Sequence, residues 1–579
     1  MRQRLLPLTV AAGLAGPCGP VPDLTIMEIQ GTGERSPYEG HTVQTAGVVT
    51  LLRADGEGFW LQDRVGDGDA STSDGIFVAE SAPAVPRVGD RLRIVADVVE
   101  RQSGRALPRT ELARVRTLEI LSGDNPVPDT VELIDLPDEV LGEGIAFWEP
   151  LEGMRVRVRN GVVVSPTSRH GELALLAEAD ARPGSGFSSR TGHMFPRSLG
   201  PGRVDYNPER ILVDDESLEK PVIVRPGDQV GNLVGVVDYT FGNYKIQPGH
   251  LDVEARPAPA SPVSRRSGDP GDTVVTTFNV ENLFDLQDEP DKDDASTTPT
   301  PEELETKLAK LALAFQQELR LPEIVVVQEV ENTAILERLA KRIDRAAKTR
   351  YRATSLGSSD RRGIEVGFLW DAARVGLREA FLLSGPEVEA AFGPGSASPG
   401  REPLVGIFEI GERELVVVGN HFKSKGGDDP LFGVNDPPLR PSEDQRKAQA
   451  RVVRGFVDSV LTDNPHALVL VAGDLNDFPF GEPGEGRHHP LAILEAEGGP
   501  APLTNLVSVM DGAEAYTFVF DGNSEVLDYL LVSPALAGRV AAVDVLHFNA
   551  AFPAALASNP ATPLRASDHD PVEARFWFR

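Results

Sequence analysis

The chain has 579 residues, too many for one hydrophobic core, so two to four domains are expected. Its 57 basic and 88 acidic residues give a net charge of −31, which excludes the basic surface of an ordinary nucleic-acid-binding module. A polyanion must then be held by local groups or through a metal ion. The single cysteine, Cys18, excludes an intrachain disulfide, and no apolar run is long enough for a membrane-spanning helix.

Residues 1–20 have the pattern of an export signal. Arg2 and Arg4 precede a modest apolar segment, and small residues follow it. We therefore expect a protein that is secreted or held in a bacterial cell envelope, with a plain N-terminal tail as the alternative. Attachment as a lipoprotein through Cys18 is disfavoured, because Pro17 interrupts the small residues that would precede such a cysteine.

Residues 24–125 are predicted to form a small all-β barrel, because short alternating runs follow one another between Gly, Asp and Pro turns. Segments such as GFWLQD and VGDRLRIVADV resemble the OB-fold modules that precede the catalytic part of secreted bacterial nucleases. Phe59 and Trp60 could stack on nucleobases, as aromatic residues of OB-folds do, although core packing is expected for at least one of them. The predicted strands are 42–51, 58–62, 75–78 and 91–98.

A second β-rich domain is predicted over residues 130–254, with His170 and His193 as surface residues because neither has partners at metal-ligand spacing. Its function cannot be read from the residues. A segment rich in Pro, Ser and Gly, residues 255–272, follows and is expected to be a linker. The strands predicted in this second domain are 154–164, 172–177, 210–213 and 229–237.

Residues 273–579 alternate strand and helix patterns, which indicates an α/β domain. Thr300 and Glu303 form a capping box at the start of an amphipathic helix, with Pro301 at its first position. Residues 285–294 are acidic and could bind Ca²⁺ as a structural ion, although they lack the spacing of a helix-loop-helix site. The predicted strands are 273–278, 324–327, 364–370, 415–418, 468–472 and 526–532, with helices over 333–348 and 443–461.

The stretch 466–480, HALVLVAGDLNDFPF, shows the common feature of these strands. An unbroken apolar run predicts a strand buried on both faces, and Asp474, Asn476 and Asp477 follow directly. Carboxylate and amide oxygens at the end of a buried strand suit a hard divalent cation or the positioning of a water. An Asx-rich turn is the alternative for this stretch taken alone.

Six segments in order, TFNVEN, VVVQEV, GNHFKSK, GDLND, LDYLLVS and SDHDPV, resemble the motifs of the endonuclease/exonuclease/phosphatase superfamily. With the barrel before them, the resemblance is greatest to large secreted bacterial nucleases with N-terminal OB-fold-like modules. It covers residues 24–578 and implies a four-layer α/β-β/α sandwich as the catalytic domain, over residues 273–579. Each motif alone is weak, whereas the set in this order is specific.

The resemblance also implies a role for each matching residue. Asp474 and Asn476 match the groups that activate the attacking water and contact the phosphate, and His569 matches the histidine at the phosphate, with Asp528 as its partner. His421 matches a second histidine. The metal-side residues are Glu329, Asp568 and Asn279, and the substrate-binding candidates are Arg401, Lys423 and Arg446.

The expected activity is metal-dependent hydrolysis of phosphodiester bonds in DNA, and in RNA as a second substrate, through in-line attack of water. Mg²⁺ or Mn²⁺ is expected, because oxygen-only ligands argue against zinc. Two alternatives stay open at this point. One is a phosphatase or phosphodiesterase for lipid or inositol phosphates, and the other is a catalytically inactive surface-binding module. No obligate protein partner is implied, and all six motifs would be kept in a chain that began near Asp272.

Overall fold

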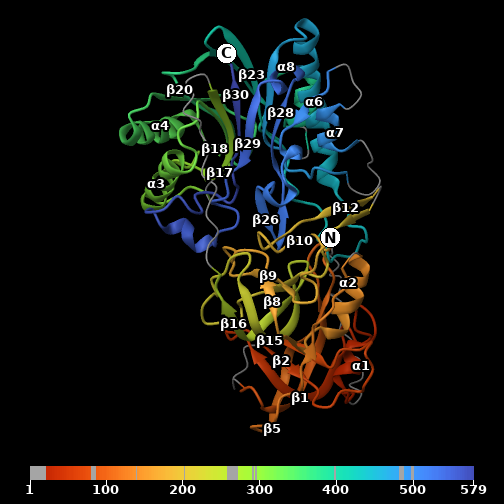
Figure 1. The fold of residues 1–579 in the computed structure, drawn as a ribbon. Helices are drawn as coiled ribbons and strands as arrows, with labels where there is room; N and C mark the ends of the chain where they lie inside the picture. Colours follow the sequence, from red (N-terminus) through yellow and green to blue (C-terminus); the bar gives the residue numbers. More distant parts are fainter. Residues whose placement is uncertain are drawn as a thin grey trace, which may run out of the picture.

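The computed structural model describes residues 21–79, 86–138, 140–200, 203–256, 272–289, 292–293, 297–394, 396, 399–481, 488–496 and 501–578. The predicted export signal with Cys18, most of the predicted linker and part of the acidic segment 285–294 lie outside these ranges. Within them, no helix combines the length and apolar character that crossing a membrane requires. In Figure 1 three units follow one another, from the N-terminal barrel through a second β unit to a large α/β unit.

The first unit is a closed five-stranded barrel with the strand order β1-β2-β3-β5-β4, so the all-β prediction is confirmed. A short helix, α1 (Ile26–Gln30), begins at a capping box formed by Thr25 and Glu28. Phe59 and Trp60 are both buried, Phe59 in the barrel core and Trp60 against Phe77. Neither ring can stack on a nucleobase. The strands are β1 (Thr42–Leu52), β2 (Phe59–Gln62), β3 (Gly75–Ala79), β4 (Arg91–Arg101) and β5 (Arg109–Ser122).

The second unit is a seven-stranded sheet in the order β16-β14-β9-β8-β15-β7-β6. Because β16 also pairs with β15, the five strands from β16 to β15 in this order form a closed ring. Helix α2 (Leu141–Trp148) packs its Trp148 against Tyr244. The strands are β6 (Val131–Glu132), β7 (Arg155–Val158), β8 (Gly161–Val163), β9 (Leu173–Ala177), β14 (Ile211–Val213), β15 (Gln229–Thr240) and β16 (Asn243–Glu254). Two small hairpins add β10 (Phe187–Ser188), β11 (His193–Met194), β12 (Arg197–Gly200) and β13 (Arg203–Asp205).

The third unit contains two six-stranded sheets. The first has the order β19-β20-β18-β17-β30-β29, with β17 (Asp272–Leu283), β18 (Ile324–Val330), β19 (Tyr351–Ser355), β20 (Glu365–Asp371), β29 (Val540–Val545) and β30 (Val572–Trp577). The second has the order β21-β22-β23-β24-β28-β25, with β21 (Gly376–Leu382), β22 (Leu404–Ile410), β23 (Arg413–His421), β24 (Leu468–Asp474), β25 (Thr504–Asn505) and β28 (Asp528–Val532). A separate hairpin is formed by β26 (Phe518–Phe520) and β27 (Asn523–Glu525).

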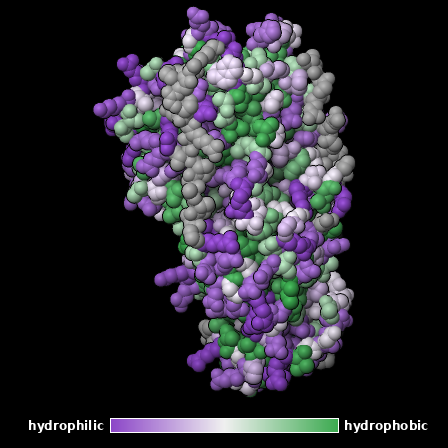
Figure 2. Space-filling model, viewed as in Figure 1, coloured by the Kyte–Doolittle hydropathy of each residue, from purple (hydrophilic) through white to green (hydrophobic). Residues whose placement is uncertain are grey.

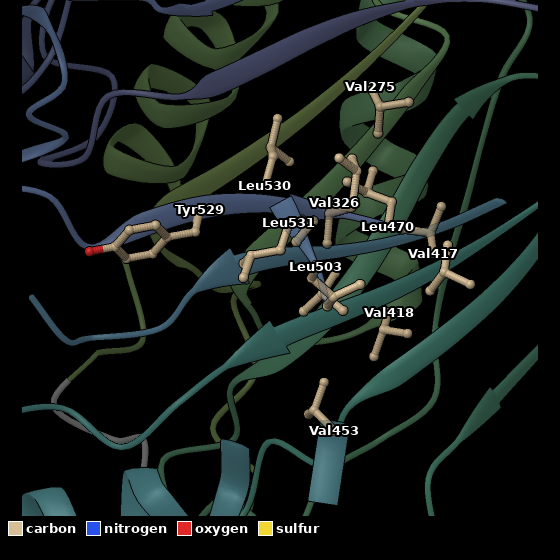
Figure 3. Close-up of a cluster of buried hydrophobic side chains, with 14 of the residues drawn as sticks. Val275, Val326, Val417, Val418, Val453, Leu470, Leu503, Tyr529, Leu530 and Leu531 are labelled. Atoms are coloured by element: carbon tan, nitrogen blue, oxygen red, sulfur yellow. The ribbon is translucent and has the colours of Figure 1, made fainter. Parts of the chain in front are cut away.

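The two sheets pack face to face, and helices cover their outer faces (Figure 1). The apolar runs at Val326 in β18 and at Leu470 in β24 meet in one core, where Val453 of α6 also packs (Figure 3). The predicted four layers are therefore observed in this unit. The helices are α3 (Pro301–Gln317), α4 (Thr333–Ala347), α5 (Pro386–Phe392), α6 (Pro441–Asp463), α7 (Pro490–Glu495) and α8 (Pro534–Ala537).

The second unit and the α/β unit share an apolar core. Phe432 and Phe478, from loops of the α/β unit, belong to the buried cluster of the second unit. His193 is buried at this junction, where its Nδ1 lies 2.7 Å from the Ser524 hydroxyl, so the prediction of a surface histidine is wrong. His170 is exposed, as expected. Figure 2 shows hydrophilic and hydrophobic residues interspersed over all three units on the visible face.

Candidate active site

Five predicted site residues stand where the inner strands of the two sheets end. Asn279 lies in β17 and Glu329 in β18, both of the first sheet. In the second sheet, strand pairing sets His421 of β23 opposite Asp474 of β24, and Asp474 opposite Asp528 of β28. Because β17–β18 and β23–β24 are parallel pairs, the side chains at their C-terminal ends gather at one edge of each sheet.

Asn279 joins the two sheets across this edge. Its Nδ2 lies 3.1 Å from Asp474 Oδ2 and 3.4 Å from Glu329 Oε1, and it donates to both carboxylates. Its Oδ1 accepts from the Glu281 amide at 3.0 Å. In this geometry Asn279 orients two carboxylates through its nitrogen, while its oxygen accepts one hydrogen bond and keeps a second lone pair. Its place on the metal side of the site stays a prediction.

The backbone at these strand ends adopts left-handed conformations that direct the side chains inward. Glu329 has φ 61° at a register shift in β18, and Asn476 has φ 52°. Gly473 has φ 145°, and a side chain there would collide with the backbone of Asn420, so glycine is required. Non-glycine residues in this region cost about 1–3 kcal/mol and cluster at functional sites.

His569 and Asp528 form a buried pair. His569 Nδ1 lies 2.8 Å from Asp528 Oδ2, which leaves Nε2 pointing toward Asp474, with its Oδ2 3.9 Å away. Burial alone would lower the pKa of His569, but the charge of Asp528 and the hydrogen bond to it raise that pKa well above 6.5. His569 is therefore held as a cation whose free nitrogen faces the centre of the site.

Asp474 lies at the centre of the site. Its Oδ1 accepts from the Asn476 amide at 2.9 Å, while Oδ2 is shared by Asn279 and the two histidines. Burial raises the pKa of Asp474 to about 7, even though the charge of His569 acts in the opposite direction. A carboxyl with a pKa near neutrality can accept a proton from water while remaining ionised in part at physiological pH.

His421 is held neutral by its surroundings. Its Nε2 lies 3.1 Å from Arg401 Nη1, and because an arginine only donates, that nitrogen must accept and the proton must sit on Nδ1. Burial and the Arg401 charge keep the pKa of His421 well below its ordinary value. Arg401 is itself buried, with Nε 3.4 Å from Asp360 Oδ2, and its charge acts on Glu329 and Asp474.

The other two substrate-binding candidates have different environments. Arg446 is buried, and its Nε donates to Asp477 Oδ2 at 2.7 Å, so its guanidinium ties helix α6 to the loop after β24. It is not available to a substrate, which corrects that prediction. Lys423 is half-buried and donates from Nζ to the carbonyls of Ser424 and Gly426 at 2.9 and 2.8 Å.

Carboxylates gather on the side of the first sheet. Glu329 and Asp568 were predicted as metal-side residues, and Glu281 and Asn282 lie beside them. Both of these have positive φ, as turn residues do, but Glu281 adds a third carboxyl, whose pKa is raised by burial and then by Asp568. Asn282 Oδ1 is buried without a hydrogen-bond partner in the described part of the chain. Mutually repelling carboxylates beside a free amide oxygen are donors that fit Mg²⁺ or Mn²⁺.

A second possible metal-holding group exists. Asp474, Asp528 and His569 offer ligand atoms that lie within 4.8 Å of one another. In that group Asp528 Oδ2 and His569 Nδ1 already bond to each other, so binding an ion through all three residues would break their pair. The set around Glu329 requires no such rearrangement.

Phe518 is a site residue that the sequence did not reveal. Its ring centroid lies 4.7 Å from that of His569. Phe518 belongs to β26, about fifty residues before His569, and only the alternation of Tyr516, Phe518 and Phe520 marks the segment as a strand. That pattern shows that the rings share a face but not what they face.

Comparison with known proteins agrees with this geometry. Residues 274–550, which form most of the α/β unit, match the model of the Endonuclease/Exonuclease/phosphatase family. Residues 123–256 match a domain of unknown function (DUF8508). None of the curated proteins matches the chain.

Several solved structures are similar to the α/β unit. A humanized TDP2 from D. rerio is 16% identical over 53% of this chain and 100% of its own, with a TM-score of 0.36. A family protein from Bacteroides thetaiotaomicron is 17% identical over 53% of this chain and 95% of its own, with a TM-score of 0.35. The human Nocturnin catalytic domain with bound sulfate is 16% identical over 54% and 95%, with a TM-score of 0.33.

Proposed function

We propose that this protein is a divalent-metal-dependent nuclease that hydrolyses phosphodiester bonds of DNA, and of RNA as a second substrate. One observation carries the proposal: Asp474 faces the free nitrogen of the Asp528–His569 pair on one side and the amide of Asn279 on the other. A base for water and a cation for the phosphate thus lie within a few ångströms of each other, among buried polar groups of fixed orientation.

In the proposed reaction Asp474 orients the attacking water and accepts its proton, since its pKa lies near 7. His569, kept cationic by Asp528, donates from Nε2 to a phosphate oxygen as negative charge builds on it. Asn476 and Asn279 fix the orientation of the Asp474 carboxylate. His421 is neutral and its Nε2 accepts from Arg401, so this nitrogen has no proton to donate to Asp474 or Glu329 and we assign His421 no proton-transfer role.

Glu329 and Asp568, with Glu281 and Asn282 beside them, are the residues that we propose hold the metal ion. A bound Mg²⁺ or Mn²⁺ would polarise the phosphate and neutralise the charge of the leaving oxygen. Glu329 is fixed for this purpose by the Asn282 amide, 3.1 Å from Oε2, and by Asn279 at Oε1.

Nucleic acid is the substrate class that the surroundings favour. Phe518 places an aromatic ring beside His569, where a nucleoside next to the cleaved bond would lie. The strand order of the N-terminal barrel, β1-β2-β3-β5-β4, supports an OB-fold-like module, although its aromatic residues are buried. Export of the protein stays a prediction from residues 1–20, to be tested by cell fractionation.

The test is hydrolysis by the purified full chain. Plasmid DNA, RNA, sphingomyelin and an inositol phosphate are each incubated with Mg²⁺ and with excess EDTA. We expect cleavage of DNA that EDTA abolishes and added Mg²⁺ or Mn²⁺ restores. Cleavage of sphingomyelin or the inositol phosphate in place of nucleic acid would establish the lipid or inositol phosphate alternative, and full activity in EDTA would exclude the metal.

A matched pair of variants tests the ligand assignment. Glu329→Gln is expected to weaken Mn²⁺ binding, measured by titration calorimetry, and to lower kcat by roughly 10²-fold or more. Glu337→Gln alters an exposed carboxylate on α4 that pairs with Lys341, and it should change neither. Unchanged Mn²⁺ affinity in Glu329→Gln would indicate that the ion binds at the Asp474–Asp528–His569 group instead.

A further inference from the structure

A ladder of aromatic rings leads away from the catalytic histidine. Phe518 and Phe520 lie on the same face of β26, and their rings are nearly parallel, with an interplanar angle of 12° and centroids 6.5 Å apart. Phe518 contacts His569, whereas Phe520 is 56% exposed. An isolated exposed phenylalanine is ordinary on a protein surface. This one continues a stack that begins at the active site.

The tip of this hairpin touches a second hairpin, from the other unit. Asn243 Nδ2, at the start of β16, donates to Asp521 Oδ2 at 3.2 Å. Gly522 makes the approach possible, because a Cβ there would lie 2.6 Å from that of Ala174. The β26–β27 turn and the β15–β16 turn are therefore neighbours on one surface, although about 280 residues separate them in the chain.

The β15–β16 turn carries Phe241 in an unusual place. Thr240 pairs with Asn243, so Phe241 and Gly242 form a two-residue turn, and both have positive φ, 52° and 80°. Such a turn favours Asn, Asp or Gly at its first position, and a bulky residue there is strained. Burial does not compensate for this strain, because Phe241 is 86% exposed. A strained, exposed aromatic residue points to a function for the ring.

The ring of Phe241 is held on one side. Lys245 Nζ lies 5.1 Å from the ring centroid, and this lysine is fixed by ion pairs with Asp214 and Glu172. A cation beneath an aromatic face stabilises the orientation of the ring. Phe241 is thereby presented as a fixed surface beside the turn that carries Phe520.

We propose that Phe520 and Phe241 form a nucleobase-stacking track that guides a single strand of nucleic acid from the active site onto the second unit. This inference rests on the proposed function and specifies that the substrate strand is unpaired where it crosses the rings, because the faces of bases inside a duplex are covered by their stacked neighbours. Base stacking on an aromatic ring contributes about 1–3 kcal/mol per base and does not depend on sequence.

The charges nearby favour this partner over a membrane. Asp521, Glu172 and Asp214 surround the track, and the chain has a net charge of −31. An anionic lipid surface would be repelled, and Lys245, which lies at the Phe241 ring, is already paired with Glu172 and Asp214. A nucleic acid strand can turn its bases toward the rings and its phosphates toward solvent, so stacking would supply the attraction that the overall charge does not.

The test compares single-stranded DNA substrates of 6 and 20 nucleotides with the full-length enzyme and Mg²⁺. In the wild type, KM should be lower for the longer strand. Phe241→Asn removes the ring but places in the turn a residue that suits positive φ, so the thermal midpoint should not fall. We expect its KM for the 20-mer to rise at least fivefold, to about the value for the 6-mer.

Val65→Asn is the matched control, because Val65 is 84% exposed and lies between β2 and β3 of the N-terminal barrel. It should leave both KM values unchanged. An unchanged KM for the 20-mer in Phe241→Asn would overturn the track while leaving the nuclease proposal intact. Weaker liposome binding by that variant, with unchanged KM, would show that the Phe241 ring contacts a membrane instead of nucleic acid. A wild type that cleaves no nucleic acid would refute the proposed function itself.

Discussion

At the scale of single residues, His569 shows how a nearby charge overcomes the effect of burial. Burial disfavours the cationic ring, but Asp528 lies 2.8 Å away and restores it. The same burial acts on Asp474 in the other direction and raises its pKa to about 7. One environment thus holds a cation for the phosphate next to a carboxyl that can accept the proton of water.

Removing the imidazole should therefore affect turnover more than binding. His569→Ala is expected to lower kcat by roughly 10²-fold or more, because a positioned acid–base group contributes on that scale. Asp528→Asn should have a smaller effect, since an amide oxygen can still accept from Nδ1 although the charge is lost. Asp463→Asn, at the exposed end of α6, serves as the control for both. A His569→Ala enzyme with near-wild-type kcat would contradict the assigned role.

Glu209 shows burial that a nearby charge does not overcome. It lies in the second unit, and burial raises its pKa to about 8 from 4.5, although the charge of Arg210 acts in the opposite direction. Between these two values the folded protein retains a proton that the unfolded chain releases, so the free energy of unfolding should fall as pH rises from about 5 to 8.

Glu209→Gln should remove this dependence. The variant and the wild type are expected to unfold at similar temperatures near pH 5, and the variant several degrees higher at pH 8.5, as measured by thermal unfolding across that range. Glu254→Gln, at an exposed position in β16, should follow the wild type at each pH. A constant difference between Glu209→Gln and the wild type would show that Glu209 does not titrate with folding.

At the scale of elements, the sequence predicts those whose side chains leave a strong pattern. Helix α3 begins at the capping box of Thr300 and Glu303 and buries Leu304, Leu308 and Leu311, as its periodicity predicts. The buried run of β24 is equally clear. The strands β19, β21 and β29 were not predicted, because each lies at the edge of its sheet, where one side is unpaired and polar residues interrupt the alternation.

The sequence likewise predicts some residues of the active site and misses others. Asp474 and Glu329 could be predicted, because each directly follows an apolar run that is typical of a buried strand. The burial of Arg446 could not, because its partner Asp477 lies in a distant loop and only the fold brings them together. Phe518 and Phe241 were missed for the same reason, since their importance depends on which turns become neighbours.

Lys310 of α3 fixes the loop that precedes the catalytic histidine. Its Nζ lies 2.7–3.1 Å from four backbone carbonyls, which share its three N–H donors: those of Leu556, Asn559, Thr562 and Leu564. Lys310→Met keeps the length of the side chain but leaves the four acceptors without their ammonium donor.

We expect this substitution to destabilise the protein by about 2–4 kcal/mol, because hydrogen bonds to a charged group contribute about 1.5–3 kcal/mol and breaking a buried network is costly. Amide hydrogen exchange should become faster over residues 546–570. Lys341→Met, at an exposed position of α4, is the control and should leave both quantities unchanged. Equal stability of the two variants would mean that the loop is fixed by its other contacts.

At the scale of the whole molecule, the catalytic loops are built into the second unit. Phe432 and Phe478 fill its core, and the carbonyl of Phe432 accepts from the Tyr239 hydroxyl. Asn523, in the hairpin that carries Phe518, accepts from Asn207 at 2.6 Å. The loop after β23, the loop after β24 and the β26–β27 hairpin each depend on the second unit for part of their packing.

This arrangement changes what truncation should do. Every motif residue lies after Asp272, so a chain beginning there keeps all six motifs, as the sequence predicts. That chain would expose Phe432 and Phe478 to water, and burying such a ring contributes roughly 1.5–3 kcal/mol each. We expect it to aggregate, or to stay soluble with kcat on a 6-nucleotide substrate at least tenfold below that of the full chain.

Co-expressing the N-terminal part with the truncated chain tests whether truncation removes only packing contacts or also groups that the reaction needs. If residues 21–256 supply only packing, co-expression of that segment with residues 272–579 should restore a soluble complex and most of kcat, because the contacts at Phe432, Phe478 and Asn523 need no covalent link. Arg190→Ala, which removes an ion pair with Asp511 at the exposed rim of the same junction, should be nearly neutral in the intact chain. A truncated chain that is monomeric and fully active would show that the active-site loops hold their shape without the second unit.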